Sequence, residues 1–586
     1  MEFTCPEFKS VTSNFLRKQL ILVMFYTQNK HSTGHPWIKT SDLYLAQRLL
    51  LRIIRHLHQR PPYVTLRKAD KWNLRLLFPF AIKTFSMRHT FIILVGLCLS
   101  NKLEAQFDME TNNGTLTITH YYGDDDVVIP STHNGLPVTG IGNSAFNTDS
   151  ITSIYIPTSI TNIGISAFYG CSALTNVFLP HSIASIGDEA FCDCAALKSI
   201  TVDTNNINYS SCDGVLFNKN RTAIIQYPNA KAGSYICPPT VAQIKRKAFH
   251  ACSSLTNITF SDSLTSIDEA AFSECSKLEH VVFPDSLLQI GDFAFYECDH
   301  LSELCIPNNS TNIGVDAFRD CTKLSNLIVG GNNTHLQKQS FFGCNELTNV
   351  VLKEGIIEIG ESSFFQCYAL ARITFPNSLT NIDDWAFHQC SRLADITLPS
   401  NLMRVGVMAF SDCSGLKDFT IPSSLTHIAP NAFSHCNTLT TMQIPSTVEK
   451  LGDLFEPPPF CGCSQLRKIN VDPSNPYYSS IHGVLFNKQQ TVLIEYPAGK
   501  SGEYRIPDGV TWINDDAFSG CTDLENITIP QSVDRIGSDA FCFCSSLTDI
   551  NIPNSNVKGI IDAFYKCTNL NSIIVGGIEQ IQHSSP

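Results

Sequence analysis

A Phe-x-x-Cys pattern recurs along most of the sequence and constrains the fold more than any other feature. It occurs fifteen times, most often at an interval of 23 residues. Self-similarity at a fixed period is the signature of repeat architectures. One complete unit runs from Cys252 to the residue before Cys275 and carries apolar residues at Leu255, Ile258, Phe260, Leu264, Ile267, Ala271 and Phe272. Because a unit this short cannot enclose its own apolar side chains, we expect the units to stack on one another.

The spacing within a unit predicts its local structure. Alternation at Ile258 and Phe260 indicates a strand that points these two side chains inward. A proline often follows, as at Pro284, and ends the strand because it has no N–H to donate. The Ala271-Phe272 pair predicts one helical turn whose Phe fills the interior. The fold class expected is therefore a β-rich repeat solenoid, with a parallel sheet on one face and short strands or helical turns on the other.

The same repeat accounts for the position of most cysteines. Fifteen of the 23 cysteines fall at one inward position, once in each unit. Equivalent residues on adjacent coils lie near the ~4.8 Å strand spacing, against a mean Cβ separation of ~3.8 Å in a disulfide. We therefore favour a reduced, buried ladder over a disulfide framework. Cys-x-Cys pairs such as Cys192 and Cys194 could suggest zinc, but no histidine recurs beside them at ligand spacing.

Two longer modules, at about 192–249 and 461–518, interrupt the period. They match each other at a constant offset of 269 residues, and each contains a Tyr-Ser-Ser…Gly-Val-Leu-Phe-Asn-Lys…Tyr-Pro run. This run predicts a β-hairpin. A substrate-binding insertion is one interpretation, but duplication of the whole module favours a structural role. Cys212 and Cys237 replace Ile481 and Ile506 of the second copy, and we favour neighbouring core positions over a bond between them.

The charge and composition of the chain change near Met87. Residues 1–86 contain 14 Lys and Arg against 4 Asp and Glu, whereas the whole chain has a net charge of -12. Residues 87–105 have a positive start and a short apolar run, which is typical of a signal peptide. We expect residues 1–86 to be a non-native or disordered extension and the mature chain to begin near Gln106. The alternative is a cytoplasmic extension before a signal-anchor.

The repeat unit resembles the 23-residue BspA-type leucine-rich repeat, as does the Tyr-Ser-Ser…Tyr-Pro module. The segment from Gly114 to Gly142 resembles the N-terminal lead-in of bacterial members. The expected organisation is a cap over 106–146, a leucine-rich-repeat solenoid over 147–576 and a tail over 577–586. The resemblance implies a secreted or cell-surface, non-enzymatic protein that acts in adhesion to host matrix or to other cells.

Motifs for catalysis are missing from the sequence. We find no nucleophile elbow, phosphate-binding loop, zinc-protease motif or dinucleotide fingerprint, and we expect no enzyme activity, cofactor or metal. The rest of the chain, after residue 86, is acidic and lacks the positive charge that attracts nucleic acid. No transmembrane segment is expected in the mature chain.

The outward positions of the predicted strands are the candidate ligand face. These side chains are mostly small and polar, which suits many shallow contacts with a protein or glycan ligand at a cell or matrix surface. The candidate residues are Asn257, Thr259, Asn326, Asn349, Arg372, Thr374, Asp395, Thr397, Asp418 and Thr420. Two alternatives stay open. The Thr and Asn residues serve only strand formation, or the array is a structural spacer or surface-layer component without a specific ligand.

Overall fold

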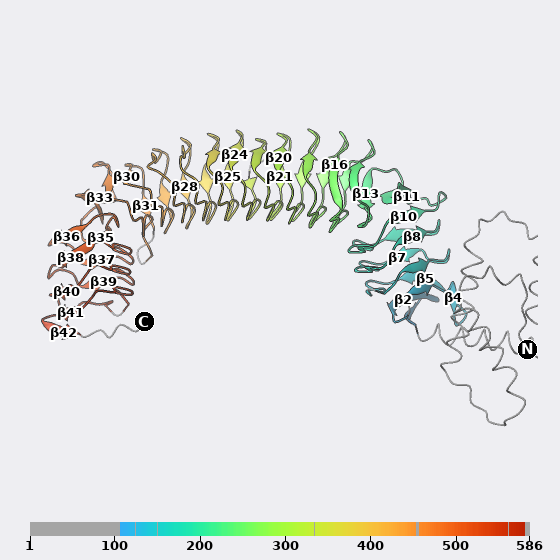
Figure 1. Ribbon diagram of the computed structural model, residues 1–586, viewed down its shortest axis with the longest axis horizontal. Helices are drawn as coiled ribbons and strands as arrows, with labels where there is room; N and C mark the ends of the chain where they lie inside the picture. The colour runs from blue at the N-terminus through green and yellow to red at the C-terminus, as the bar shows by residue number, and fades with distance from the viewer. Residues whose placement is uncertain are drawn as a thin grey trace, which may run out of the picture. The chain divides into compact units, whose positions relative to one another are not determined.

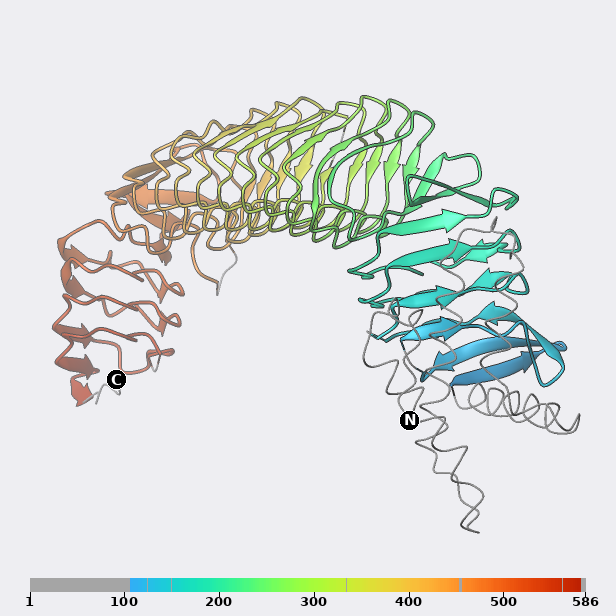
Figure 2. The same ribbon diagram turned by 45° about the vertical axis from the view of Figure 1, so that its right-hand side comes forward.

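The computed structural model describes residues 106–580, apart from Asp124, Asp149, Asn333, Thr334, residues 453–455 and Ile561. The expected extension (1–86) and signal segment (87–105) lie outside the described residues. In the described part, the repeats form successive coils of a solenoid, from the β1–β2 hairpin to the β41–β42 hairpin (Figure 1). Figure 2 shows the same coils stacked side by side. The expected β-rich repeat solenoid is confirmed.

The main strand of each coil joins a parallel sheet. Seven strands pair in sequence order with a constant register, so that Asn326 lies beside Asn349 and Asn349 beside Arg372. Inward and outward side chains alternate, as in β20, where Leu304 and Ile306 are buried. The strands of this sheet are β14 (Gly233–Ile236), β16 (Leu255–Thr259), β18 (His280–Val282), β20 (Glu303–Ile306), β22 (Asn326–Val329), β24 (Asn349–Leu352) and β26 (Arg372–Thr374).

A second sheet is built from the return path of each coil. Most of its thirteen strands contain two residues, and the second of the two is a buried Ile, Leu or Val. Its strands are β11 (Tyr209–Cys212), β12 (Val215–Asn218), β13 (Ala223–Gln226), β15 (Gln243–Ile244), β17 (Ser266–Ile267), β19 (Gln289–Ile290), β21 (Asn312–Ile313), β23 (His335–Leu336), β25 (Glu358–Ile359), β27 (Asn381–Ile382), β28 (Arg404–Val405), β29 (His427–Ile428) and β31 (Lys450–Leu451).

Smaller sheets continue the same two paths at each end of the array. The N-terminal ones contain β1 (Phe107–Asn112), β2 (Thr115–Tyr121), β3 (Asp126–Val128), β4 (Thr132–His133), β5 (Leu136–Ile141), β6 (Ser153–Tyr155), β7 (Asn162–Ile163), β8 (Asn176–Leu179), β9 (Ser185–Ile186) and β10 (Ser199–Val202). The C-terminal ones contain β30 (Thr441–Ile444), β32 (Lys468–Val471), β33 (Tyr478–Ile481), β34 (Val484–Asn487), β35 (Val492–Glu495), β36 (Gly502–Arg505), β37 (Trp512–Ile513), β38 (Leu524–Thr528), β39 (Arg535–Ile536), β40 (Asp549–Ile552), β41 (Ser572–Val575) and β42 (Ile578–Gln580).

The Ala-Phe corner is a turn rather than the expected helical turn, and the described residues contain no helix. Two residues flank it with positive φ, as at Trp385 (54°) and Gln389 (65°). Left-handed residues end a right-handed helix, and every second N–H group of the corner donates to the next coil instead. The Phe387 N–H donates to the Ala409 carbonyl oxygen at 2.7 Å. This corner therefore forms a third hydrogen-bonded ladder along the array.

Stacked phenylalanine rings fill the interior at this corner. The Phe387 ring lies 5.2 Å from the Phe364 ring and 5.0 Å from the Phe410 ring, with interplanar angles of 5° and 11°. Phe387 is fully buried. Near-parallel rings at this spacing add an aromatic contribution to the gain from area burial. The prediction that one Phe per coil fills the solenoid interior is confirmed.

The corner cysteines are free thiols buried beside these rings. Most of these thiols donate to the carbonyl oxygen of the Phe one coil earlier; Cys390 Sγ, for example, lies 3.2 Å from the Phe364 oxygen. That carbonyl also accepts from the Cys367 N–H. A small side chain with a weak donor suits this tight corner, and the expected buried ladder is present. Cys212 and Cys237 are also free, the first half-buried and the second buried.

Both modules contain an antiparallel hairpin, β11–β12 in the first and β33–β34 in the second. A fully buried asparagine joins each hairpin to the preceding coil. The Asn206 amide donates to the Pro180 and Ile183 carbonyl oxygens, and its Oδ1 accepts from the Tyr209 N–H. Asn475 makes the same set of bonds in the second module. The polar atoms of the buried amide are thus satisfied, as a stable interior requires.

The modules differ at one buried position in their third strands. Gln226 on β13 donates to the Tyr227 and Ala248 carbonyl oxygens. Its counterpart Glu495 on β35 is 2% exposed and accepts from the Phe460 N–H at 3.4 Å. Burial raises the pKa of Glu495 to about 8. The second module therefore encloses a carboxyl group that stays protonated at neutral pH.

We predict that Phe387→Ala destabilises the array much more than Phe564→Ala. Truncating a buried Phe costs about 3–5 kcal/mol, and Phe387 has ring partners in both neighbouring coils. Among the described residues, Phe564 has one ring partner, Phe541 in the coil before it. Thermal unfolding should show a split or broadened transition for Phe387→Ala and only end fraying for Phe564→Ala. Equal effects would mean that the coils do not unfold as coupled neighbours.

We predict that alkylation of the native protein distinguishes its cysteines. Cys305 is exposed on β20, whereas Cys390 is fully buried. Burial also raises the pKa of Cys390 well above its ordinary value, which keeps the thiol unreactive. Peptide mapping after iodoacetamide treatment should find Cys305 modified in the native state and Cys390 only after unfolding. A Cys212–Cys237 link in non-reducing maps would contradict the free thiols described above.

We predict that stability falls as pH rises from about 4.5 to about 8 because of Glu495. The pKa of this carboxyl is raised from 4.5 to about 8, so the unfolded chain releases its proton at lower pH than the folded chain does. Each pKa unit corresponds to about 1.36 kcal/mol. Glu495→Gln, which imports the residue of the first module, should gain on the order of 2–4 kcal/mol at pH 8.

Denaturant unfolding at pH 5, 7 and 8 measures this effect. The matched control is Gln226→Glu, which should introduce the same pH dependence into the first module. An unchanged slope for Glu495→Gln would show that another group controls the pH response.

Candidate functional site

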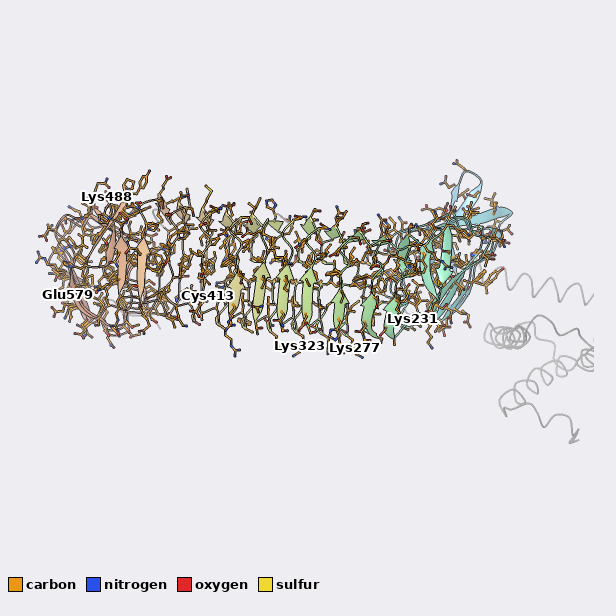
Figure 3. The ribbon with its side chains drawn as sticks, turned by 90° about the horizontal axis from the view of Figure 1, so that it is seen from above. Lys231, Lys277, Lys323, Cys413, Lys488 and Glu579 are labelled. Atoms are coloured by element: carbon orange, nitrogen blue, oxygen red, sulfur yellow. The ribbon has the colours of Figure 1, made fainter. Side chains whose placement is uncertain are left out.

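The candidate ligand face consists of the outward side chains of the main strands, here called the outer strand face. Figure 3 looks onto the seven-stranded sheet, whose strands run parallel from coil to coil, with Lys277 and Lys323 near one edge. Of the residues named from the sequence, Thr259, Asn326, Arg372 and Thr374 are exposed on this sheet, and Asn257 and Asn349 are half-buried. The structure brings these six residues onto one surface.

The other four sequence-predicted residues occupy equivalent coil positions beyond the sheet. Asp395, Thr397, Asp418 and Thr420 are exposed but belong to no strand, and only an isolated bridge joins Asp395 to Arg372. Asp395 pairs with Lys417 at 3.3 Å.

Asp418 has a structural role at the start of β30. Its carboxylate accepts from the Thr440 and Thr441 N–H groups at 2.6 and 3.1 Å, and from both threonine hydroxyls. Partial burial raises the pKa of Asp418, but these hydrogen bonds outweigh it and leave the pKa below its ordinary value. In the preceding coil the Lys417 N–H donates to the Ala394 carbonyl oxygen. A side chain thus substitutes for the backbone acceptor at the step from this coil to β30.

Several exposed apolar residues lie on the outer strand face, and all but Val282 escaped the sequence reasoning. They occupy the second outward position of their strands and are exposed by half or more: Val128, Tyr155, Phe178, Ile236 and Val282. Val128 lies beside Tyr155 in the β3–β6 pair, and Thr259 separates Ile236 from Val282 in register. Extending the repeat register towards the N-terminus would have found them. The large exposed apolar side chains are therefore concentrated between β3 and β18.

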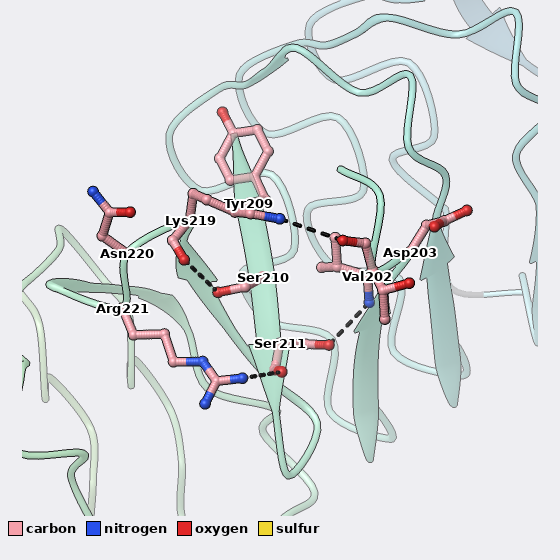
Figure 4. A pocket seen from close by; sticks show the side chains of 9 residues that line it. Val202, Asp203, Tyr209, Ser210, Ser211, Lys219, Asn220 and Arg221 are labelled. Atoms are coloured by element: carbon pink, nitrogen blue, oxygen red, sulfur yellow. Dashed lines mark hydrogen bonds between the residues drawn. The ribbon is translucent and has the colours of Figure 1, made fainter. Parts of the chain in front are cut away.

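A hollow of about 380 Å³ lies beside the first hairpin. Figure 4 shows Arg221 donating to the Ser211 carbonyl oxygen at 3.4 Å and Ser211 accepting from the Val202 N–H at 3.0 Å. The Lys219 ammonium donates to the Thr204 and Asn206 carbonyl oxygens, and Lys488 makes the equivalent bonds in the second module. The lysine in this hollow therefore holds the hairpin, as expected for a structural module.

A second hollow, of about 560 Å³, lies at the second module. Its wall includes His435, Cys461, Asp516 and Asp539. Burial raises the pKa of Asp516 to about 6, and the Asp539 carboxylate adds to this rise. The hollow is acidic at neutral pH.

Comparison with known protein families matches the repeats. The family model described as "BspA type Leucine rich repeat region (6 copies)" matches residues 139–230, 226–348, 334–467 and 496–585. The comparison with curated proteins gave no match. Among the described residues, none belongs to a helix long and apolar enough to cross a bilayer.

Solved structures of bacterial leucine-rich-repeat proteins also match. A leucine-rich repeat protein from Bacteroides ovatus is 23% identical, with 79% of this chain and 97% of that chain covered and a TM-score of 0.43. A leucine rich cell surface protein from Faecalibacterium prausnitzii is 26% identical, with 76% and 92% covered and a TM-score of 0.31. Because the family model matches well over half of the sequence and falls on the coils described above, this protein belongs to the BspA-type leucine-rich-repeat family.

Proposed function

We propose that the protein is an exported, non-enzymatic recognition protein that binds a protein or glycan ligand at a cell or matrix surface. Its ligand would lie on the outer strand face. The observation that carries this proposal is the set of large apolar side chains exposed there, with Tyr155 60% and Phe178 51% exposed. Exposed apolar groups that gather on one surface mark interaction sites, and aromatic residues dominate binding energies at such sites.

The strand geometry supports the same proposal. Tyr155 and Phe178 are 23 residues apart and project from the neighbouring strands β6 and β8. Ile236 and Val282 project in the same way from β14 and β18. Because the sheet holds these side chains in fixed positions, a ligand gains their contacts without ordering a flexible loop. The polar residues from Asn326 to Thr374 extend the surface with hydrogen-bonding groups.

We predict that Tyr155→Ser with Phe178→Ser weakens ligand binding at least tenfold and leaves the fold intact. Losing two exposed aromatic anchors costs affinity but little stability, since neither side chain is in the core. The full chain and the variant would be compared in pull-downs and direct binding against matrix proteins, glycan arrays and partner cells. The matched control is Gln289→Ser with Asn312→Ser, at exposed positions of the second sheet.

Equal loss in both variants would contradict recognition by the outer strand face. Absence of binding to every class of ligand would favour the alternative role as a structural spacer or surface-layer component. A supporting result is binding by the full chain and the control variant that the Tyr155/Phe178 variant loses.

A further inference from the structure

The first module brings together three metal-ligating side chains that are distant in the sequence. Cys192 and Asp193 follow the Phe191 corner, and His250 follows the next regular corner at Phe249. The insertion of the module separates the two corners in sequence, but their side chains meet, as Glu189 and Lys247 do at 3.0 Å. One ligand atom from each of the three residues lies within 4.8 Å of the other two, and this is the one such group among the residues that the structure describes.

The distances suit a small divalent cation. His250 Nε2 lies 3.3 Å from Asp193 Oδ1. Tetrahedral zinc, with Zn–S near 2.3 Å and Zn–N or Zn–O near 2.0–2.2 Å, places its ligand atoms roughly 3.2–3.8 Å apart. The separation of His250 and Asp193 is therefore already in this range, and the Cys192 sulfur lies within 4.8 Å of both atoms. Zinc accepts this mixture of sulfur, nitrogen and oxygen ligands.

The surroundings of His250 contain buried polar atoms without hydrogen-bond partners. His250 is 9% exposed, and its Nδ1 is buried without a hydrogen-bond partner. The Asn229 amide donates to the His250 carbonyl oxygen at 2.7 Å, while its own Oδ1 has no partner. A buried polar atom without a partner costs about 1–3 kcal/mol. Nε2 is the ring atom beside Asp193, so an ion held there would leave Nδ1 without a partner, and the support for the site is the close approach of the three ligand atoms.

Neighbouring residues support ion binding at this point. The Asp193 carboxylate and burial raise the pKa of Tyr169, whose hydroxyl therefore lies near Asp193. Carboxylates that bind metals are commonly held by a hydrogen bond from a neighbouring group. Lys247 and Arg246 are the positive side chains near the cluster. Both pair with Glu189, at 3.0 and 2.9 Å, and this pairing weakens their repulsion of a bound zinc ion.

The second module provides an internal comparison. The counterpart of Cys192 is Cys461, but Gly462, Ser519 and Ala498 stand where the first module has Asp193, His250 and Asn229. The hairpin and its buried asparagine are the same in both copies, so the fold of a module does not need these three residues. The cluster of carboxylate, imidazole and amide is an addition to the first module alone.

We propose that Cys192, Asp193 and His250 form a zinc site with three protein ligands and a fourth position open to water or a ligand. This site departs from the sequence-based expectation of no metal, which rested on the lack of a histidine near the Cys-x-Cys pairs. Asp193 is the most exposed of the three and provides the entry from solvent. Burial and then the Asp193 carboxylate raise the pKa of Cys192, so the thiol is protonated without an ion and loses its proton when zinc binds.

Metal binding by the full-length chain tests this proposal, with zinc as the probe under reducing conditions. The informative variants import residues from the second module: Asp193→Gly and His250→Ser. Asp193 has a φ of 57°, which glycine adopts without strain, so both variants should fold. Equilibrium dialysis with elemental analysis should show one equivalent of zinc per chain lost in each variant, and about a tenfold weaker affinity in Tyr169→Phe.

Cobalt substitution tests the sulfur ligand independently. The wild-type chain should show a thiolate-to-cobalt absorption band that Cys192→Ser loses and the matched control Cys461→Ser retains. The proposal is overturned if the wild-type chain binds no zinc, if His250→Ser binds as much as wild type, or if Cys461→Ser removes the band as fully as Cys192→Ser does.

Discussion

The stack of phenylalanine rings at the coil corner, with its ladder of thiol-to-carbonyl hydrogen bonds, is the contact on which every coil depends. Phe387 contacts the ring before it and the ring after it, and Cys390 bonds to the Phe364 carbonyl oxygen one coil back. Each corner is therefore completed by its neighbours rather than by its own residues. Interactions of this kind make stability a sum over adjacent coils. They also explain why the repeat keeps its Phe-x-x-Cys pattern while its outward residues vary.

The two modules show how the same scaffold carries different chemistry. Their hairpins and the buried Asn206 and Asn475 are equivalent, so both copies attach to the array in the same way. Their buried polar residues are not equivalent. The first copy has Gln226 and the Cys192–Asp193–His250 cluster, and the second has Glu495 and Ser519. Because each difference sits where one coil packs on another, it changes the local charge without changing the path of the chain.

The outer strand face is where the sequence is least constrained by packing. Its side chains alternate with buried ones along each strand, so they can change without a cavity or a clash in the core. Apolar residues such as Tyr155 and Phe178 cluster before the first module, and polar ones follow towards Thr374. Burial does not explain this division. In our proposal it reflects ligand recognition, whereas Asp418, which belongs to the same series of positions, stabilises the backbone instead.

The sequence by itself determined the solenoid, the inward Phe and Cys positions and the duplicated modules, because a fixed period of apolar residues admits few other solutions. It also located Asn326, Arg372 and Thr374 on an exposed face, since strand alternation is a local property. Only the tertiary structure decided that left-handed residues flank the Ala-Phe corner and that Asp418 replaces a backbone acceptor before β30. It alone placed His250 beside Cys192, because contacts between coils join residues whose separation in sequence carries no signal when an insertion lies between them.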